Sequence, residues 1–138
     1  MSSDKTPPAG TRLLEEVALL VWRPEGVINE ATVNQIIDYL ANLEMRRKQP
    51  FNRFIDTGLA EAVDLNFRYI FHISLFRRLS YRGPAVQTAI VAADDAISRY
   101  FKLHELLTQG SAIEVRHFKE YEPAAAWLKV PVEALQST

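Results

Sequence analysis

Cysteine is absent from the chain, and glycine is scarce, with only 5 among 138 residues. Without thiols the protein has no disulfide, no thiolate nucleophile and no zinc site with Cys ligands. The glycines stand singly, so the chain contains neither a P-loop nor a dinucleotide-binding fingerprint. A Gly-x-Ser-x-Gly nucleophile elbow and a His-Glu-x-x-His zinc motif are missing too. These absences favour a protein that is not an enzyme and that carries no metal or cofactor.

An excess of charge of one sign is missing as well, because 16 Lys and Arg face 17 Asp and Glu. A general nucleic-acid or anionic-membrane binder needs a basic surface, which a formal charge of -1 does not favour. No apolar run approaches the roughly 20 residues that span a bilayer, and residues 1–10 lack the apolar segment of a secretory signal. Because small secreted domains usually rely on disulfides, we expect a cytoplasmic protein.

What the chain does have is a high apolar content: 48% of its residues are hydrophobic, enough for one domain with a buried core. Short apolar runs predict strands at 17–22, 51–56, 86–93 and 113–118. A brief strand at 27–28 is expected to pair with the first one across the turn at Pro24 and Gly26.

Helical spacing and capping residues predict four helices. They run from Asn29 to about residue 48, over 66–79, from Asp94 or Asp95 to Gly110, and onward from Pro123 as first helical residue. Strands that alternate with helices predict an α/β domain with a mostly parallel sheet of four to five strands. We place this domain at residues 13–130, between a flexible N-terminal tail (1–12) and a C-terminal tail (131–138).

Two segments resemble a known family. The stretch from Val17 to Glu30, VALLVWRPEGVINE, resembles the opening of the STAS domain, the sulfate-transporter and anti-sigma-factor-antagonist module. There a strand is followed by a Gly, an apolar pair and a small polar helix cap. Residues Glu114–Phe118, followed by Ala125–Leu128, are similar to the end of the SpoIIAA-like branch, where a strand ending in Phe leads to a helix carrying Ala-Trp-Leu. By element order the resemblance covers residues 13–130.

The resemblance implies a STAS-like domain with a mixed or parallel sheet and four helices, usually bacterial and cytoplasmic, that acts by protein–protein contact. Some relatives have been suggested to bind small apolar or lipid-like ligands. In anti-sigma-factor antagonists a phosphorylated Ser follows an Asp at the start of a helix. Here Asp64 is present but Leu65 stands in the place of the Ser, so that switch cannot operate. Thr57, after Asp56, is another candidate phosphosite, although Thr at the end of a strand is commonly a turn former.

The helix expected over residues 66–79 has apolar side chains in nearly every direction, whereas a helix lying on one sheet buries only one stripe. Its remaining apolar surface must be covered by the chain itself, by a second copy or another protein, or by a ligand, or else form an exposed patch. We expect an interface or ligand groove on this helix and the next one, formed by Phe67, Arg68, Tyr69, Phe71, His72, Phe76, Tyr100, Phe101 and His104.

Positive charge clusters around the same helix, because Arg68, Arg77, Arg78 and Arg82 lie between Leu65 and Gly83 with no acidic residue among them. The ordinary explanation is a solvated helix flank that pairs with Glu61 or Asp64. Two functional hypotheses stand beside it. One is contact with a protein partner, either a second copy in a homo-oligomer or a regulatory protein.

The other hypothesis is a carrier or sensor of a small amphipathic anion such as a fatty acid. In that case Phe67, Phe71, Tyr100 and Phe101 would line the pocket, and Arg68 or His104 would meet the head group. The histidines at 72, 104 and 117 are too dispersed to form a short metal motif.

Overall fold

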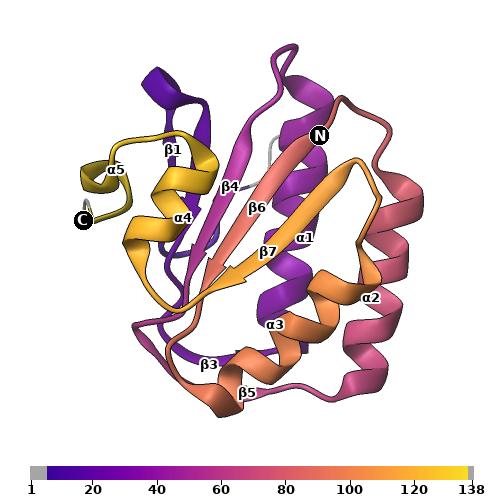
Figure 1. Ribbon diagram of the computed structural model, residues 1–138. Coiled ribbons are helices and arrows are strands. Elements are labelled where there is room, and N and C mark those ends of the chain that lie inside the picture. Colours follow the sequence, from indigo (N-terminus) through magenta and orange to yellow (C-terminus); the bar gives the residue numbers. More distant parts are fainter. Residues whose placement is uncertain (1–5, 137–138) are drawn as a thin grey trace.

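Five strands form the main sheet of the computed structural model, which describes residues 6–136 (Figure 1). The strand order is β1-β2-β4-β6-β7. The bounds are β1 Thr11–Leu14, β2 Leu19–Trp22, β4 Asn52–Asp56, β6 Val86–Val91 and β7 Ile113–Phe118. β1 is antiparallel to β2, and the other three pairings are parallel. The predicted α/β fold with a mostly parallel sheet is confirmed.

The apolar segment near the start of the chain forms two strands where one was predicted. β1 and β2 make an antiparallel hairpin in which Leu13 lies opposite Leu20. The connection is the 3-10 turn η1 Glu15–Val17 followed by Ala18, whose φ of 48° is left-handed. The exposed acidic pair at Glu15 and Glu16 interrupts the apolar run, so the chain turns back there. β1 also begins inside the segment expected as an N-terminal tail, of which residues 1–5 lie outside the described residues.

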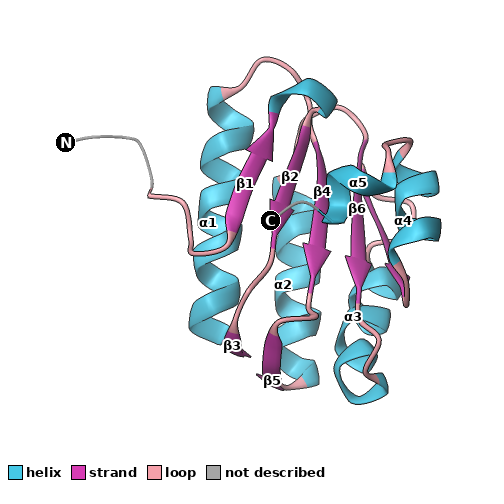
Figure 2. Ribbon diagram, turned by 90° about the vertical axis from the view of Figure 1, so that its left-hand side faces the viewer, coloured by secondary structure: helices cyan, strands magenta, loops and turns pink. Residues whose placement is uncertain are grey.

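The brief strand predicted at 27–28 exists as β3 Gly26–Asn29, but its expected partner is wrong. β3 pairs in parallel with β5 Ala60–Asp64, a strand that the sequence did not indicate, in a separate two-stranded sheet. This small sheet lies below the carboxyl ends of β2 and β4 (Figure 2). Ile28 packs there against Leu65 and Ile70, so the small sheet closes one end of the core.

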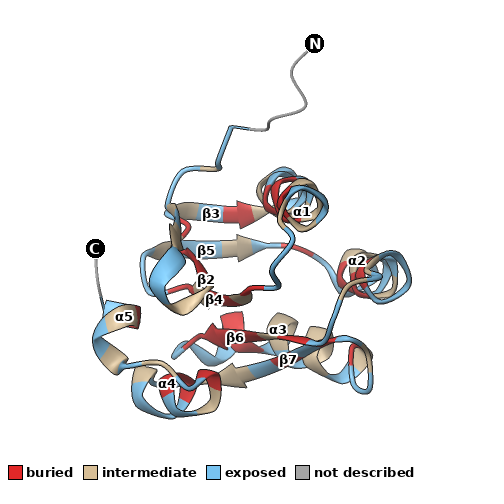
Figure 3. Ribbon diagram, turned by 90° about the horizontal axis from the view of Figure 1, so that it is seen from above, coloured by how far each residue is buried: buried red, intermediate tan, exposed pale blue. Residues whose placement is uncertain are grey.

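Helices cover both faces of the main sheet (Figures 1 and 3). α1 Glu30–Arg46, α2 Phe67–Ser80 and α3 Asp95–Leu107 lie on one face, and α4 Tyr121–Leu128 and α5 Val132–Gln136 lie on the other. The side chains of Asn29, Asn66 and Asp94 accept backbone hydrogen bonds in the first turns of α1, α2 and α3. α4 begins earlier than predicted, so Pro123 is its third residue. That position is tolerated because first-turn N–H groups have no partner within the helix.

The two faces of the sheet pack into separate apolar cores. Toward α1, the core contains Leu20, Trp22 and Phe51 from the sheet side and Ile36, Tyr39, Leu40 and Leu43 from the helix. Toward α4 and α5, Leu19, Val21, Phe54 and Ala89 pack against Ala124, Leu128 and Leu135. Leu135 is fully buried, so most of the segment expected as a C-terminal tail belongs to the domain. A helix as short as α5 shows no periodicity that would have revealed it.

Candidate functional site

Helix α2 has an inverted distribution of side chains: two of its polar residues are buried and four of its large apolar residues are exposed, the reverse of an ordinary surface helix. Its buried residues are Ile70, Ser74 and Arg77, two of which are polar. Its large apolar side chains lie outside instead: Phe67, Phe71, Phe76 and Leu79 are 45% to 70% exposed. Together with the exposed Arg68 and His72, these four residues form what we call the α2 face. An exposed aromatic surface of this kind is unusual on a monomeric domain that has no binding partner.

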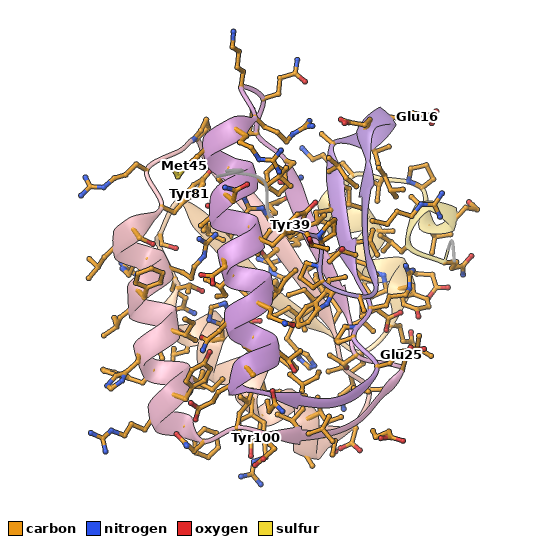
Figure 4. The ribbon with its side chains drawn as sticks, turned by 180° about the vertical axis from the view of Figure 1, so that it is seen from behind. Glu16, Glu25, Tyr39, Met45, Tyr81 and Tyr100 are labelled. Atoms are coloured by element: carbon orange, nitrogen blue, oxygen red, sulfur yellow. The ribbon has the colours of Figure 1, made fainter. Side chains whose placement is uncertain are left out.

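One end of the α2 face is tied to α3. The rings of Phe67 and Tyr100 are 5.2 Å apart between centroids, and the guanidinium carbon of Arg99 lies 5.5 Å from the centroid of Phe67. Figure 4 shows Tyr100 at one end of the neighbouring helices α1 and α2, and Met45 and Tyr81 at the opposite end. Tyr100 therefore lies beside the α2 face, and Arg99 adds a cation that was not anticipated.

The remaining predicted residues lie elsewhere. The hydroxyl of the half-buried Tyr69 donates a 2.6 Å hydrogen bond to Asn34 Oδ1 on α1. Phe101 packs beneath α3 against the sheet, and His104 turns inward. These three side chains are partly buried and lie apart from the α2 face, on the sides of α2 and α3 that meet α1 and the sheet.

A polar contact joins α2 to α3 inside the domain. Ser74 Oγ and His104 Nδ1 share a 2.7 Å hydrogen bond. Burial of the imidazole, and then the positive charge of Arg77, lower the pKa of His104 to about 4. His104 is therefore neutral at neutral pH and would bring no positive charge to an anionic head group.

A buried ion cluster joins α2 to α1. Arg77 donates both terminal nitrogens to the carboxylate of Glu44, at 3.3 and 2.5 Å, and Arg53 Nη2 lies 2.8 Å from Glu44 Oε2. Of the four arginines expected on a solvated flank, Arg77 is thus buried with Glu44 as partner. Arg78 donates instead to the carbonyls of Leu107 and Gln109 at the end of α3.

A small cavity lies between α1, α2, α3 and the sheet. It holds about 90 Å³ and is lined mainly by apolar side chains such as Ile36, Ile73 and Phe101, with His104 at its wall. Binding pockets for drug-sized ligands usually hold about 300–1,000 Å³. The cavity is therefore too small for a fatty acid unless the helices move apart.

The hydroxyl of Thr57 is buried and donates a 2.8 Å hydrogen bond to the carbonyl of Val91. A kinase could not reach this hydroxyl unless the chain unfolded locally at the carboxyl end of β4. The contacts of Thr57 are those of a residue that forms a turn. Asp64 ends β5 and is exposed, whereas Leu65 is buried against Ile28 and Ile70. The position of the missing switch Ser is therefore part of the core.

A hydrogen-bonded cluster around the carboxylate of Asp56 lies at the carboxyl end of β4, and the sequence did not predict it. Asp56 Oδ2 accepts a 2.5 Å hydrogen bond from the Tyr121 hydroxyl and a 3.3 Å contact from Arg23 Nε, and Asp56 Oδ1 accepts from the N–H of Gly58. Burial, and then the hydrogen bond to Asp56, raise the pKa of Tyr121 to about 12. The cluster joins three distant segments, and an Asp that ends an apolar strand was its one visible signal.

The histidines do not meet in space. His72 is exposed on α2, His104 bonds Ser74, and His117 Nε2 lies 3.1 Å from the carbonyl of Ala92. Within residues 6–136, no group of three or more metal-ligating His, Asp or Glu side chains occurs. In the same range no helix combines the length and the apolar character that crossing a membrane requires.

The comparisons with known proteins concern the fold. No family model matches the chain, and no curated protein matches it. A solved structure to which the chain is similar is that of an uncharacterized protein of the DUF3478 family with a SpoIIAA-like fold, from Shewanella loihica PV-4. It is 14% identical, with a TM-score of 0.49 over 80% of this chain and 83% of that chain. Functional conclusions rest on the residues of this chain alone.

Proposed function

We propose that the protein is a non-catalytic binding domain that docks an acidic protein partner on the α2 face. The observation that carries this proposal is the inversion of α2, which buries Ser74 and Arg77 and leaves Phe67, Phe71 and Phe76 exposed. Aromatic residues and arginine are the types that protein interfaces favour. A rigid helix that presents them needs little reorganisation on binding.

Charge favours an acidic partner over a second copy of the chain. The α2 face contains Arg68, and Arg99 lies beside it over the ring of Phe67. No acidic residue lies between Leu65 and Gly83, the segment that contains Arg68 and the whole of the α2 face. A symmetric contact between two α2 faces would bring arginines together without a carboxylate, and like charges in an interface oppose association.

The carrier hypothesis has less support. The internal cavity of about 90 Å³ is small, and His104 is neutral at its wall. Phe67 and Phe71, which were expected to line a pocket, are exposed on the surface. These features fit a surface that meets a partner better than a container for a lipid.

Photo-crosslinking in the native cell tests the proposal. A photoreactive phenylalanine analogue replaces Phe71 in one variant and the exposed Glu133, on the opposite face of the sheet, in a matched control. We expect a discrete crosslinked protein from position 71 alone, and its loss on the added substitution Arg68→Glu. When the crosslinking is repeated in a lysate of these cells, we also expect the yield to fall as salt rises, because salt screens attraction between opposite charges.

Two outcomes would overturn the proposal. Identical crosslinking from both positions means that the α2 face has no partner. A crosslink of twice the mass of the chain, strengthened by salt, means self-association through α2 and rejects the acidic partner.

A further inference from the structure

A groove lined by both charged and apolar side chains lies at the opposite end of α2 from Phe67. It holds about 430 Å³ between the C-terminal ends of α1 and α2, next to the start of β4. Figure 4 shows Met45 and Tyr81, which line it, at this end of the helix pair. Its volume falls within the range of about 300–1,000 Å³ that is usual for small-molecule sites.

The floor of the groove is the buried ion cluster of Arg53, Arg77 and Glu44. Both arginine side chains are more than nine-tenths buried, and they share one carboxylate. Arg53 Nε donates a 2.9 Å hydrogen bond to the carbonyl of Phe51. Arg53 Nη2 lies 2.8 Å from Glu44 Oε2, the same carboxylate oxygen that Arg77 contacts, so the two guanidinium groups share one counter-charge. Two buried positive charges on one negative charge leave a charge that an external anion could neutralise.

The charge around the groove matches a dianion. Five cationic side chains line it, namely Arg47, Lys48, Arg53, Arg77 and Arg82. Glu44 in the floor and Glu15, which pairs with Arg47 at 3.0 Å, supply two negative charges. The C-termini of α1 and α2 add about half a negative charge each. The balance is about two positive charges, close to the charge of about -1.5 to -2 that a phosphate monoester carries at neutral pH.

The walls of the groove are apolar. Met45 is 85% exposed and Phe76 is 53% exposed at its rim, which is far more than large apolar residues usually show. Arg53 lies 4.4 Å from the centroid of the Phe51 ring and 5.6 Å from that of Tyr81, so the cationic floor and the aromatic walls are in contact. A ligand that fits both has an anionic group and an apolar body.

We infer that this groove binds a soluble phosphate monoester with an apolar or aromatic body, whose phosphate meets Arg53 and Arg77 in the floor while Lys48 and Arg82 face it from the rim. The groove shares Phe76 with the α2 face, but its charged floor lies outside that face, so its ligand binding can be tested separately from partner docking. Replacement of Phe71, which lies outside the groove, is expected to leave phosphate-ester binding unchanged.

Isothermal titration of the full chain with phenyl phosphate tests this inference. The variants are Lys48→Gln and Arg82→Gln, both exposed at the rim, and the matched controls are Lys102→Gln and Arg116→Gln, exposed outside the groove. We expect each rim substitution to weaken binding about threefold to tenfold, as loss of one nearby charge does at a protein surface, and the controls to bind as the unmodified chain does. Equal binding by rim and control variants, or no binding by the unmodified chain, would overturn the inference.

Other probes distinguish the sources of the anion. We expect phenyl phosphate to bind more tightly than inorganic phosphate, which lacks the apolar body, and more tightly than benzoate, which has one charge. Vesicles containing phosphatidic acid are expected to bind no better than neutral vesicles. Binding to those vesicles without binding of phenyl phosphate would reject a soluble ligand.

The substitution Glu44→Gln tests whether the ligand interacts with the buried arginines of the floor, separately from the rim residues. Removal of the shared carboxylate leaves Arg53 and Arg77 without a counter-charge, so phosphate ester should raise the melting temperature of this variant by more than it raises that of the unmodified chain. An equal or smaller rise would show that the buried arginines do not meet the ligand. If the variant does not fold at all, the rim variants and their controls still decide the matter.

Discussion

Lowering the pH should destabilise this protein through one residue, His104. The imidazole is enclosed between α2 and α3, where Nδ1 bonds Ser74 and Arg77 is close enough to oppose a second positive charge. The perturbation is acidification of the unmodified protein and of His104→Asn. Asparagine can place an amide group near the position of Nδ1 and does not titrate, so it keeps a partner for Ser74 while removing the proton-binding site.

The sign and size of the effect follow from the two pKa values of His104. The free side chain has a pKa of about 6.5, and burial lowers the pKa in the folded protein to about 4. Between these values the unfolded chain binds a proton that the folded protein does not, so the free energy of unfolding falls as the pH decreases. From about pH 7 to about pH 4.5 the loss is about 2 kcal/mol, and it reaches about 3 kcal/mol below the folded pKa.

Urea unfolding followed by tryptophan fluorescence, which comes from the buried Trp22 and the half-buried Trp127, measures this loss. The carboxylates titrate alike in both proteins, so the difference between the two pH profiles isolates His104. We expect the unmodified chain to lose about 2 kcal/mol more than His104→Asn over this range. Parallel profiles would refute the reasoning, because they would mean that the imidazole takes up its proton as readily in the folded protein as in the unfolded chain.

Three further predictions concern the cluster at Glu44, the bond between Asp56 and Tyr121, and the short helix α5. Glu44→Gln should lower the free energy of unfolding by about 3–5 kcal/mol in urea without added anion, because it leaves Arg53 and Arg77 buried without a carboxylate. Glu15→Gln, which breaks the exposed pair with Arg47, should cost less than about 1 kcal/mol, and equal losses would contradict the account of a buried cluster. Asp56→Asn should lower the pKa of Tyr121 from about 12 toward the ordinary value. Ultraviolet absorbance of tyrosinate, with Tyr121→Phe to identify the signal, would show no change if the carboxylate did not hold the phenol. Leu135→Ala should lower the free energy of unfolding by about 2–5 kcal/mol in thermal or urea unfolding. An unchanged free energy of unfolding would mean that α5 does not contribute to the core.

Local patterns predicted most of the secondary structure of this chain. β7 spans Ile113–Phe118 as expected because its buried and exposed residues alternate at the start of the strand, and α2 starts after its predicted cap Asn66. β5 was missed because Glu61 and Ala62 are both exposed and give the segment no apolar periodicity. The antiparallel β1 was missed because its pairing with β2 depends on a turn that no glycine or proline announces.

The candidate sites were harder to predict, because they depend on contacts between distant segments. The surplus of apolar residues on α2 was visible in the sequence, and so was its basic character. That Arg77 points inward could not be seen, since its partner Glu44 lies 33 residues away on α1. The bond between Asp56 and Tyr121 spans 65 residues and links two elements with no shared pattern. Pairings of this kind follow from topology and not from periodicity.

The central claim is that the large aromatic side chains of α2 lie outside the core, where a partner can reach them. The most direct test compares the free energies of unfolding of Phe71→Ser and Ile70→Ser, two adjacent positions that are 46% and 4% exposed. We predict a loss of about 1 kcal/mol or less for Phe71→Ser and of about 3 kcal/mol or more for Ile70→Ser. Equal and large losses would contradict the claim, because Phe71 would then belong to the core and could not serve as a docking residue.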